Sequence, residues 1–315
     1  MDIISNNQQI LVLKGWEGFA DRLQVLSHCM HYCLINDAAI CVDWRDYMWG
    51  QEVLDFSDYF EILGIKTITL NDVILKMKDG ASILPSCWTI DDINNIPNET
   101  NHFSNYNLEF NNYERINSDI IVNNGKGQRT WHVDNLIQNL RLKKSISDQI
   151  IERIKMLELP FSIIHLRGTD RLINKSIEES IQPAINEINN KPPHILARMY
   201  LISDMHDMKN LWLSKFPKTK IIIPNNQISN LPQGTVGIHQ LDKEVLDFYG
   251  VTKKELNIDA LTDFITICLS SWNISNSSES LFTKMGIIMR QGGKIGICKW
   301  LHGFEPTNKP LPPKY

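Results

Sequence analysis

The stretch SIIHLRGTD, Ser162 to Asp170, decides how the rest of the chain is interpreted. Its β-branched apolar residues predict a buried strand, which runs directly into His165, Arg167 and Asp170. A strand that only fills a core usually ends in turn residues such as Gly, Asn or Ser. Ionisable groups at this point indicate a ligand or catalytic site. The structural alternative is an interdomain ion pair made by Arg167 or Arg171.

Strands and helices alternate on both sides of this stretch, which predicts parallel α/β sheets. In the second half we expect strands at 161–166, 199–203, 220–224 and WNIS, and a short segment at GIHQL. Helices are expected at 176–190, 205–215, 258–271 and 280–290. In the first half we expect strands at 9–13 and 38–44 around a helix at 21–36, then helix and strand in FSDYFEILGI and KTITL, and a helix at 133–157 interrupted near LKKSIS.

The length of 315 residues predicts two domains, which we place at 1–158 and 159–315. Ligands bind outside the carboxyl ends of strands in such sheets, so a cleft between the domains is the expected site. Residues 91–124 are rich in asparagine and show no clear period, which favours long surface loops, with a recognition region and disorder as alternatives.

Composition excludes several classes of protein. A net charge of −4 argues against a nucleic-acid partner. The chain shows no membrane span and no secretory signal, so we expect a cytoplasmic protein. The six cysteines fit reduced core thiols. A metal site in HCMHYC, residues 28–33, is the less favoured alternative to an apolar helical stripe.

Two further junctions between strand and helix have the chemistry of anion sites. In KGWEGFADRL, Gly15 and Gly18 allow close backbone approach, and Asp21 can cap the helix that carries Arg22. In NISNSSESLF, residues 273–282, hydroxyl groups precede a helix whose N-terminus suits a phosphate group. A plain tight turn and a plain helix cap are the structural alternatives.

With these elements in this order, the chain resembles the superfamily of GDP-fucose-dependent fucosyltransferases, which includes α1,6-, α1,2- and peptide O-fucosyltransferases. The resemblance rests on GFADRLQVL, HLRGTD, YLISD and SNSSESLFTKMG, and it spans most of the chain apart from the asparagine-rich region. It implies a GT-B-like fold, in which two Rossmann-like α/β domains face a cleft. The first domain would face the acceptor, and the second would hold the sugar nucleotide.

The resemblance also implies an inverting transfer of fucose from GDP-fucose to a glycan hydroxyl group, without a metal ion or other cofactor. Arg167 would contact the β-phosphate, His165 and Asp204 would lie near the guanine, and Ser278 and Ser280 would hold the pyrophosphate. The remaining residues that it assigns to donor binding are Arg171, Phe282, Gly18 and Arg22. The acceptor would be an oligosaccharide or glycolipid of polysaccharide biosynthesis, and a peripheral membrane contact stays open.

The catalytic base has several candidates. Glu17 comes first, because peptide O-fucosyltransferases carry a similar G-E-G-F loop, followed by Asp170 and then Glu178 or Glu179. Members with α1,6 or α1,2 specificity usually have two adjacent arginines, whereas this chain has Gly168 in the second position, so no subfamily is assigned. Two alternatives remain: a transferase of another nucleotide sugar, and a non-catalytic protein that binds a nucleotide or glycan.

Overall fold

The computed structural model describes residues 8–15, 18–51, 54–97, 113–123, 132–168, 172, 175–192, 196–221, 241–277, 280–291 and 294–308. The chain divides into two compact units, Met1–Lys143 and Lys144–Tyr315. The sequence placed the boundary between residues 158 and 159, whereas these units assign the helix α5 (Lys144–Ile154) to the second one.

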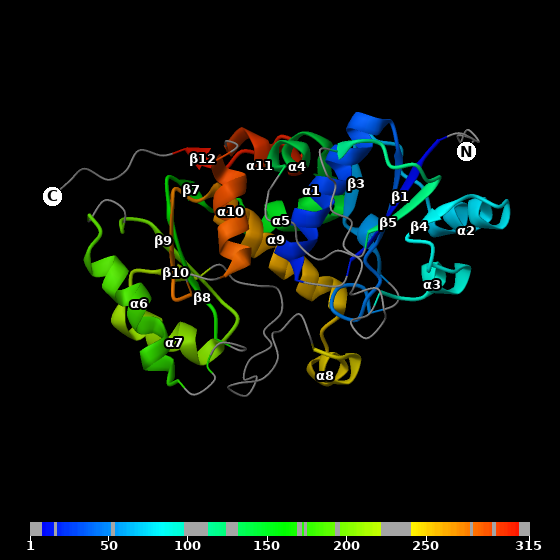
Figure 1. Cartoon of the computed structure of the whole chain (residues 1–315). Helices are drawn as coiled ribbons and strands as arrows, with labels where there is room; N and C mark the ends of the chain where they lie inside the picture. Colours follow the sequence, from blue (N-terminus) through cyan, green and yellow to red (C-terminus); the bar gives the residue numbers. More distant parts are fainter. Residues whose placement is uncertain are drawn as a thin grey trace. The chain divides into compact units, whose positions relative to one another are not determined.

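The first unit is built on a parallel four-stranded sheet (Figure 1). Its order is β2 (Ala39–Asp43), β1 (Ile10–Lys14), β5 (Ile120–Asn123) and β4 (Ile83–Leu84). The helix α1 (Phe19–Asn36) connects β1 to β2, and α2 (Leu70–Lys78) and α3 (Ile90–Asn94) come before and after β4. Lys14 pairs with Asp43 in the register, so both residues lie at the carboxyl edge of the sheet.

Helices cover both faces of this sheet. Ile10 and Val12 pack with Val73 of α2 and Ile93 of α3 in one buried cluster. The alternate residues of β1 point to the opposite face, where α1 contacts β1 and β2. Apolar side chains are therefore required on both faces, which explains why β1 is buried along its whole length.

One expectation for the first half was wrong. FSDYFEILGI is not a helix, because it forms the 3-10 turn η1 (Phe56–Asp58) and the strand β3 (Phe60–Ile62). This strand pairs antiparallel with β6 (Leu140–Leu142). The helix expected at 133–157 is interrupted near LKKSIS as predicted, because β6 separates α4 (Val133–Asn139) from α5. In β3, two buried residues flank an exposed one, which is the period of a strand.

Residues 66–70 and 91–124 also differ from the prediction. KTITL contributes one isolated bridge, between Thr67 and Ile40, and then Thr69 caps α2. The asparagine-rich region does not consist only of loops, because Ile120–Asn123 forms the fully buried strand β5. Burial of IIV between β1 and β4 outweighs the polar composition of the residues around it.

The second unit contains another parallel sheet, in the order β10 (Lys220–Ile221), β9 (Met199–Ser203), β8 (Ser162–Leu166) and β11 (Trp272–Ser275). Figure 1 shows α6 (Ile177–Asn189) beside α7 (His206–Lys215). The other elements are α8 (Lys243–Tyr249), α9 (Lys253–Leu269), α10 (Leu281–Gln291), α11 (Lys294–Trp300) and the pair β7 (Glu158–Leu159) and β12 (Thr307–Asn308). Residues 222–224 and GIHQL lie outside the described residues.

The strand order of the second sheet reverses beside β8. The chain proceeds from β8 to β9 and β10 on one side, and then returns to place β11 on the other side. Such a reversal is a topological switch point, where ligands bind in open α/β sheets. Ile164 and Leu166 pack against α6 and α7, so His165 points to the opposite face of the sheet.

The cysteines fit the expectation of core thiols. All are free, and Cys29, Cys33, Cys41, Cys268 and Cys298 are buried, whereas Cys87 is exposed. None of the helices in the described ranges combines the length and the apolar character needed to cross a bilayer.

Candidate active site

Asn276, directly after β11, fixes the main chain of Arg167 at the switch point of the second sheet. The backbone N–H of Arg167 donates to Asn276 Oδ1 at 2.8 Å, and Asn276 Nδ2 donates to the carbonyl oxygen of Arg167 at 2.9 Å. The same Nδ2 lies 3.0 Å from Ser180 Oγ of α6. One amide side chain therefore holds the segment that carries the predicted phosphate ligand.

Gly168 lies close to the start of α7. Its backbone N–H donates to Asp204 Oδ1 at 2.7 Å. A Cβ atom at this position would lie 3.0 Å from the Cβ and Sδ atoms of Met205 and 3.2 Å from Met208 Cε. These contacts explain why the residue after Arg167 is glycine, because a larger side chain would have to displace Met205 and Met208.

His165 is buried between β8 and α10. Its Nδ1 atom lies 2.7 Å from Thr283 Oγ1, and its ring centroid is 6.0 Å from that of Phe282. Burial, and then the charge of Arg167, lower the pKa of His165 to about 4. The imidazole is therefore neutral at pH 7 and can take part in hydrogen bonds to a ligand without adding charge.

Ser280 marks the beginning of α10 at the same edge of the sheet. Lys284 N donates to the Ser280 carbonyl oxygen at 3.0 Å, which makes Ser280 the residue before the first helical turn. Its hydroxyl group is buried and accepts a long 3.4 Å bond from Thr283 N. The positive end of the helix dipole is therefore located directly after β11.

Asp263 of α9 has a strongly shifted pKa that the sequence did not suggest. Burial raises the pKa of its carboxyl group to about 7, with Lys209 acting in the opposite direction and the charges of Asp259 and Asp204 acting in the same one. Carboxyl groups with strongly shifted pKa values concentrate at functional sites.

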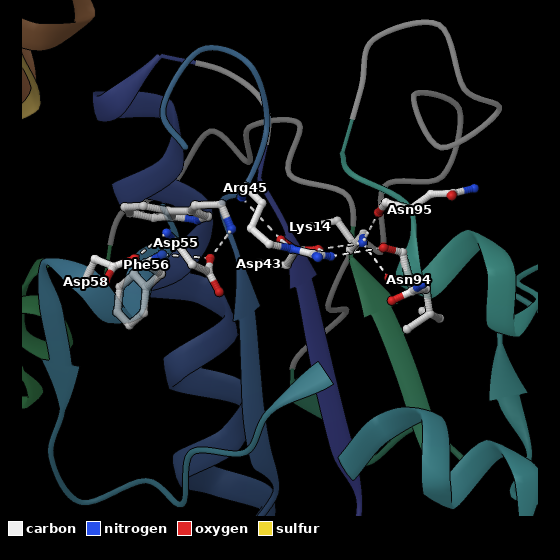
Figure 2. Close-up of polar contacts among 10 residues, drawn as sticks. Lys14, Asp43, Arg45, Asp55, Phe56, Asp58, Asn94 and Asn95 are labelled. Atoms are coloured by element: carbon white, nitrogen blue, oxygen red, sulfur yellow. Dashed lines mark hydrogen bonds and ion pairs between the residues drawn. The ribbon is translucent and has the colours of Figure 1, made fainter. Parts of the chain in front are cut away.

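The carboxyl edge of the first sheet carries a network of buried charges (Figure 2). Lys14 Nζ donates to Asp43 Oδ2 at 2.6 Å and to the carbonyl oxygens of Ile93 and Asn95 at 2.7 Å each. Arg45 adds bonds of 2.9 and 3.0 Å to the Asp43 carboxylate. An ammonium group has three donors, so this environment satisfies Lys14.

The two buried partners of this network have pKa values below their usual range. Burial lowers the pKa of Lys14 against the opposing effect of Asp43. Burial alone would raise the pKa of Asp43, but the hydrogen bond from Arg45 and the charges of Lys14 and Arg45 outweigh it. Asp43 is therefore a carboxylate at neutral pH, and two cations neutralise it.

Asp55 lies beside this network, after β2. Its Oδ1 atom accepts the backbone N–H groups of Trp44 and Phe56, each at 2.7 Å. It also forms a capping box with Asp58 at the start of η1. Burial, and then the charge of Asp43, raise the pKa of Asp55 to about 6.

Buried contacts hold the junction between β1 and α1, which contains Gly15, in place. Arg22 is buried, forms an ion pair with Asp46 and lies 5.4 Å from the Trp44 ring centroid. A Cβ atom on Gly15 would lie 2.5 Å from Trp44 Cδ1, so glycine is required there. These contacts indicate that Arg22 holds the loop in place.

The expectation that Asp21 caps this helix was wrong. The N-cap of α1 is Gly18, which makes no side-chain cap bond, and Asp21 lies in the first turn. A carboxylate in the first turn still interacts favourably with the helix dipole.

Several predicted residues lie outside the part of the chain that the structure describes. These are Glu17, Asp170, Arg171 and Ser278, and their roles stay predictions. Of the last candidates for the base, Glu179 accepts the backbone N–H of Ser176 at 2.9 Å and caps α6, and Glu178 is exposed in the first turn of that helix.

A group of aromatic and imidazole rings occupies the position where the sequence offered a metal site. His28 Nδ1 lies 2.5 Å from Tyr113 Oη, which also bonds to His132 Nε2, and His31 stacks on His132 with ring centroids 3.9 Å apart. Within the described ranges, no group of three or more potential metal ligands is arranged to hold an ion. Burial, and then the charges of His31 and His28, lower the pKa of His132 to about 4.

Sequence reasoning missed the residues that support the site. Asn276, Thr283, Lys14 and Asp263 were not predicted as site residues, although Asn276 was recognised as part of the third junction. A polar residue directly after a buried strand was available as a signal for Asn276 and Lys14. Nothing comparable marks Asp263, which lies in the middle of a helix.

Comparison with solved structures identifies the fold. The fucosyltransferase NodZ from Bradyrhizobium aligns with a TM-score of 0.57 and 16% identity over 90% of this chain and 94% of that one. NodZ α-1,6-fucosyltransferase soaked with GDP-fucose gives 0.56 and 16%, over 90% and 93%. POFUT1 in complex with GDP gives 0.53 and 12%, over 97% and 99%.

The predicted fold class is therefore confirmed as the GT-B-like α/β fold of these fucosyltransferases, with two Rossmann-like units. No protein-family model matches the chain. No curated protein matches it either.

Proposed function

We propose that the chain is a glycosyltransferase that transfers fucose from GDP-fucose to a hydroxyl group of a glycan, with inversion at the anomeric carbon. The observation that carries the proposal is the position of Arg167, whose main chain Asn276 holds at the switch point of the second sheet. The fold shared with fucosyltransferases that were solved with GDP or GDP-fucose supports the choice of donor.

Charge development explains why an arginine belongs at this position. Breaking the bond between sugar and phosphate leaves an additional negative charge on GDP. A guanidinium group that is already in place stabilises this charge more in the transition state than in the ground state. The N-terminus of α10 adds a partial positive charge. Together these groups can supply the counter-charge, so we propose a reaction without a metal ion.

The remaining site residues would hold the nucleotide. Neutral His165 and the carboxylate of Asp204 provide hydrogen-bonding groups near the ends of β8 and β9. An ionised carboxylate accepts two parallel N–H donors, a pattern that the edge of a guanine base presents. We further propose that the reaction belongs to polysaccharide or glycolipid synthesis in the cytoplasm.

Replacement of Arg167 tests the proposal. We expect Arg167→Ala to lower turnover of GDP-fucose by a factor of roughly 100 to 1,000, with an unchanged circular dichroism spectrum. Arg198→Ala is the matched control, because Arg198 precedes β9 at the opposite edge of the sheet and contacts Glu158. Turnover by Arg167→Ala within about threefold of the unmodified protein would remove Arg167 from the mechanism.

Measurements of binding and of reaction rate distinguish this proposal from a transferase of another nucleotide sugar and from a non-catalytic binding protein. Tryptophan fluorescence titration with GDP-fucose and with other nucleotide sugars shows which donor the protein prefers. Tight binding of GDP-fucose without any release of GDP would favour the non-catalytic alternative. A large loss in the rate of fucose transfer on addition of EDTA would contradict the metal-independent mechanism.

A further inference from the structure

We propose that Thr283 is a positioning residue, whose hydroxyl group keeps the imidazole proton of His165 on Nε2 and so presents an N–H donor to the nucleotide. The identity of the ligand rests on the proposed function. The state of the imidazole ring does not, because it follows from a contact between two residues of the second unit.

The contact between these two residues is short and buried. His165 lies on β8, and its ring points to the face of the sheet opposite α6 and α7. Ser275 of β11 pairs with His165 in the register, and α10 begins soon afterwards at Leu281. Thr283, in the first turn of α10, therefore reaches the imidazole, with 2.7 Å between Oγ1 and Nδ1. His165 is 8% exposed and Thr283 is 5% exposed, so water has little access to this bond.

The protons available to the pair limit the direction of the hydrogen bond. Burial and the charge of Arg167 lower the pKa of His165, so at pH 7 the neutral ring has one N–H group and one nitrogen lone pair. The Thr283 hydroxyl group has one hydrogen. Within the described ranges, Oγ1 of Thr283 makes no hydrogen bond except the one to Nδ1. The bond therefore runs either from the hydroxyl group to Nδ1 or from Nδ1–H to Oγ1.

The first direction satisfies both groups. The hydroxyl hydrogen then lies on the lone pair of Nδ1, and the ring proton is on Nε2. In the opposite direction, the hydroxyl hydrogen of Thr283 would be buried without an acceptor among the described residues. The typical cost of an unsatisfied buried donor corresponds to a factor of roughly 5 to 150 in the ratio of the two states. Thr283 therefore favours the form of His165 that carries its proton on Nε2.

The Nε2–H group is what His165 can offer to a ligand. In the part of the chain that the structure describes, no residue forms a hydrogen bond with Nε2. His165 lies two residues before Arg167 near the carboxyl end of β8, where the switch point of the second sheet predicts a ligand. An N–H donor binds atoms with an available lone pair, which GDP presents at O6 and N7 of its base and at its phosphate oxygens. A ligand group that itself carries N–H would be disfavoured there.

Nuclear magnetic resonance of the full-length protein labelled with ¹⁵N-histidine tests the state of the ring. The signals of His165 among the nine histidines are identified by their absence in His165→Gln. At pH 7 we expect Nδ1 to be unprotonated and Nε2 to be protonated. Thr283→Val keeps the branched shape and lacks the hydroxyl group, so both nitrogen signals should shift towards the average of the two neutral forms. The affinity for GDP in a fluorescence titration should fall roughly 3- to 10-fold.

Two further variants separate positioning from packing. Thr283→Ser retains the hydroxyl group and should keep both the nitrogen signals and the GDP affinity of the unmodified protein. Thr266→Val is the matched control, because Thr266 is also buried in a helix, but its hydroxyl group donates to the carbonyl oxygen of Thr262 at 2.7 Å. This control should change neither measurement.

The opposite results overturn the inference. A proton on Nδ1 in the unmodified protein does so, as do unchanged nitrogen signals in Thr283→Val or changed signals with an unchanged GDP affinity. Equal losses of affinity in Thr283→Ser and Thr283→Val would assign the effect to packing. If circular dichroism shows that Thr283→Val is unfolded, Thr283→Ala takes its place under the same criteria. An unmodified protein that does not bind GDP refutes the proposed function instead, and the nitrogen signals still decide the state of His165.

Discussion

Replacing Lys14 with methionine should destabilise the first unit strongly. Methionine keeps the apolar stem of the side chain, so the change removes mainly the charge and the three donors. Asp43 then keeps only Arg45, and the carbonyl oxygens of Ile93 and Asn95 lose the Lys14 donor. All of this occurs at a lysine with 1% of its surface exposed.

The expected cost follows from these contacts. Removing one partner of a buried ion pair costs about 3–5 kcal/mol. Arg45 offsets part of this, whereas each carbonyl oxygen that loses its donor adds about 1–3 kcal/mol. We therefore expect a loss of about 4 kcal/mol in the free energy of unfolding. For a unit of this size, that lowers the melting temperature by roughly 8–16 °C.

Urea unfolding followed by tryptophan fluorescence measures this loss. Lys144→Met is the control, because its ion pair with Asp148 is exposed and should contribute at most about 0.5 kcal/mol. A loss below about 1 kcal/mol in Lys14→Met, or an equal loss in the control, would refute the account of the network.

Two further results are expected. Asn276→Ala should weaken GDP binding, because it releases the main chain of Arg167. Asn186→Ala, at an exposed position on α6, should leave the affinity unchanged in the same fluorescence titration. Equal affinities of the two variants would contradict the role of Asn276. The folded pKa of His132, about 4, lies below its ordinary value of 6.5, so its contribution to stability is complete above about pH 6.5 and is lost as pH falls towards 4. Urea midpoints across this range should therefore fall less steeply for His132→Gln, and parallel curves would refute the assignment.

The strands that line the two sites were predictable from the sequence. Ile163 and Ile164, and the apolar run that ends at Lys14, are buried on both faces and read clearly as parallel strands. The residues at the carboxyl ends of these strands therefore indicated where the two candidate sites lie. Ser280 shows the limit of such reasoning, because the same motif allowed Ser278 or Ser280 to precede the helix, and only the hydrogen bond from Lys284 places its beginning.

Other parts of the structure depend on contacts that are distant in the sequence. FEI becomes a strand because it meets LRL about 80 residues later, and a single sequence does not contain that pairing. The hydrogen bonds between Asn276 and the main chain of Arg167 likewise join residues that are 109 positions apart. Asp55 looks like an ordinary turn residue until its neighbours Asp43 and Arg45 are known.

The pairing of β1 with β5 also has a consequence for biosynthesis. Ile10 lies opposite Ile120, and β2 supplies only one of the two neighbours that β1 needs. At about 5–20 residues per second, a ribosome needs roughly 5–20 s to extend the chain from one strand to the other. During this interval one side of an apolar strand has no hydrogen-bonding partner and can pair wrongly with other nascent chains. Chaperones that bind extended apolar segments would therefore act on β1 during this interval.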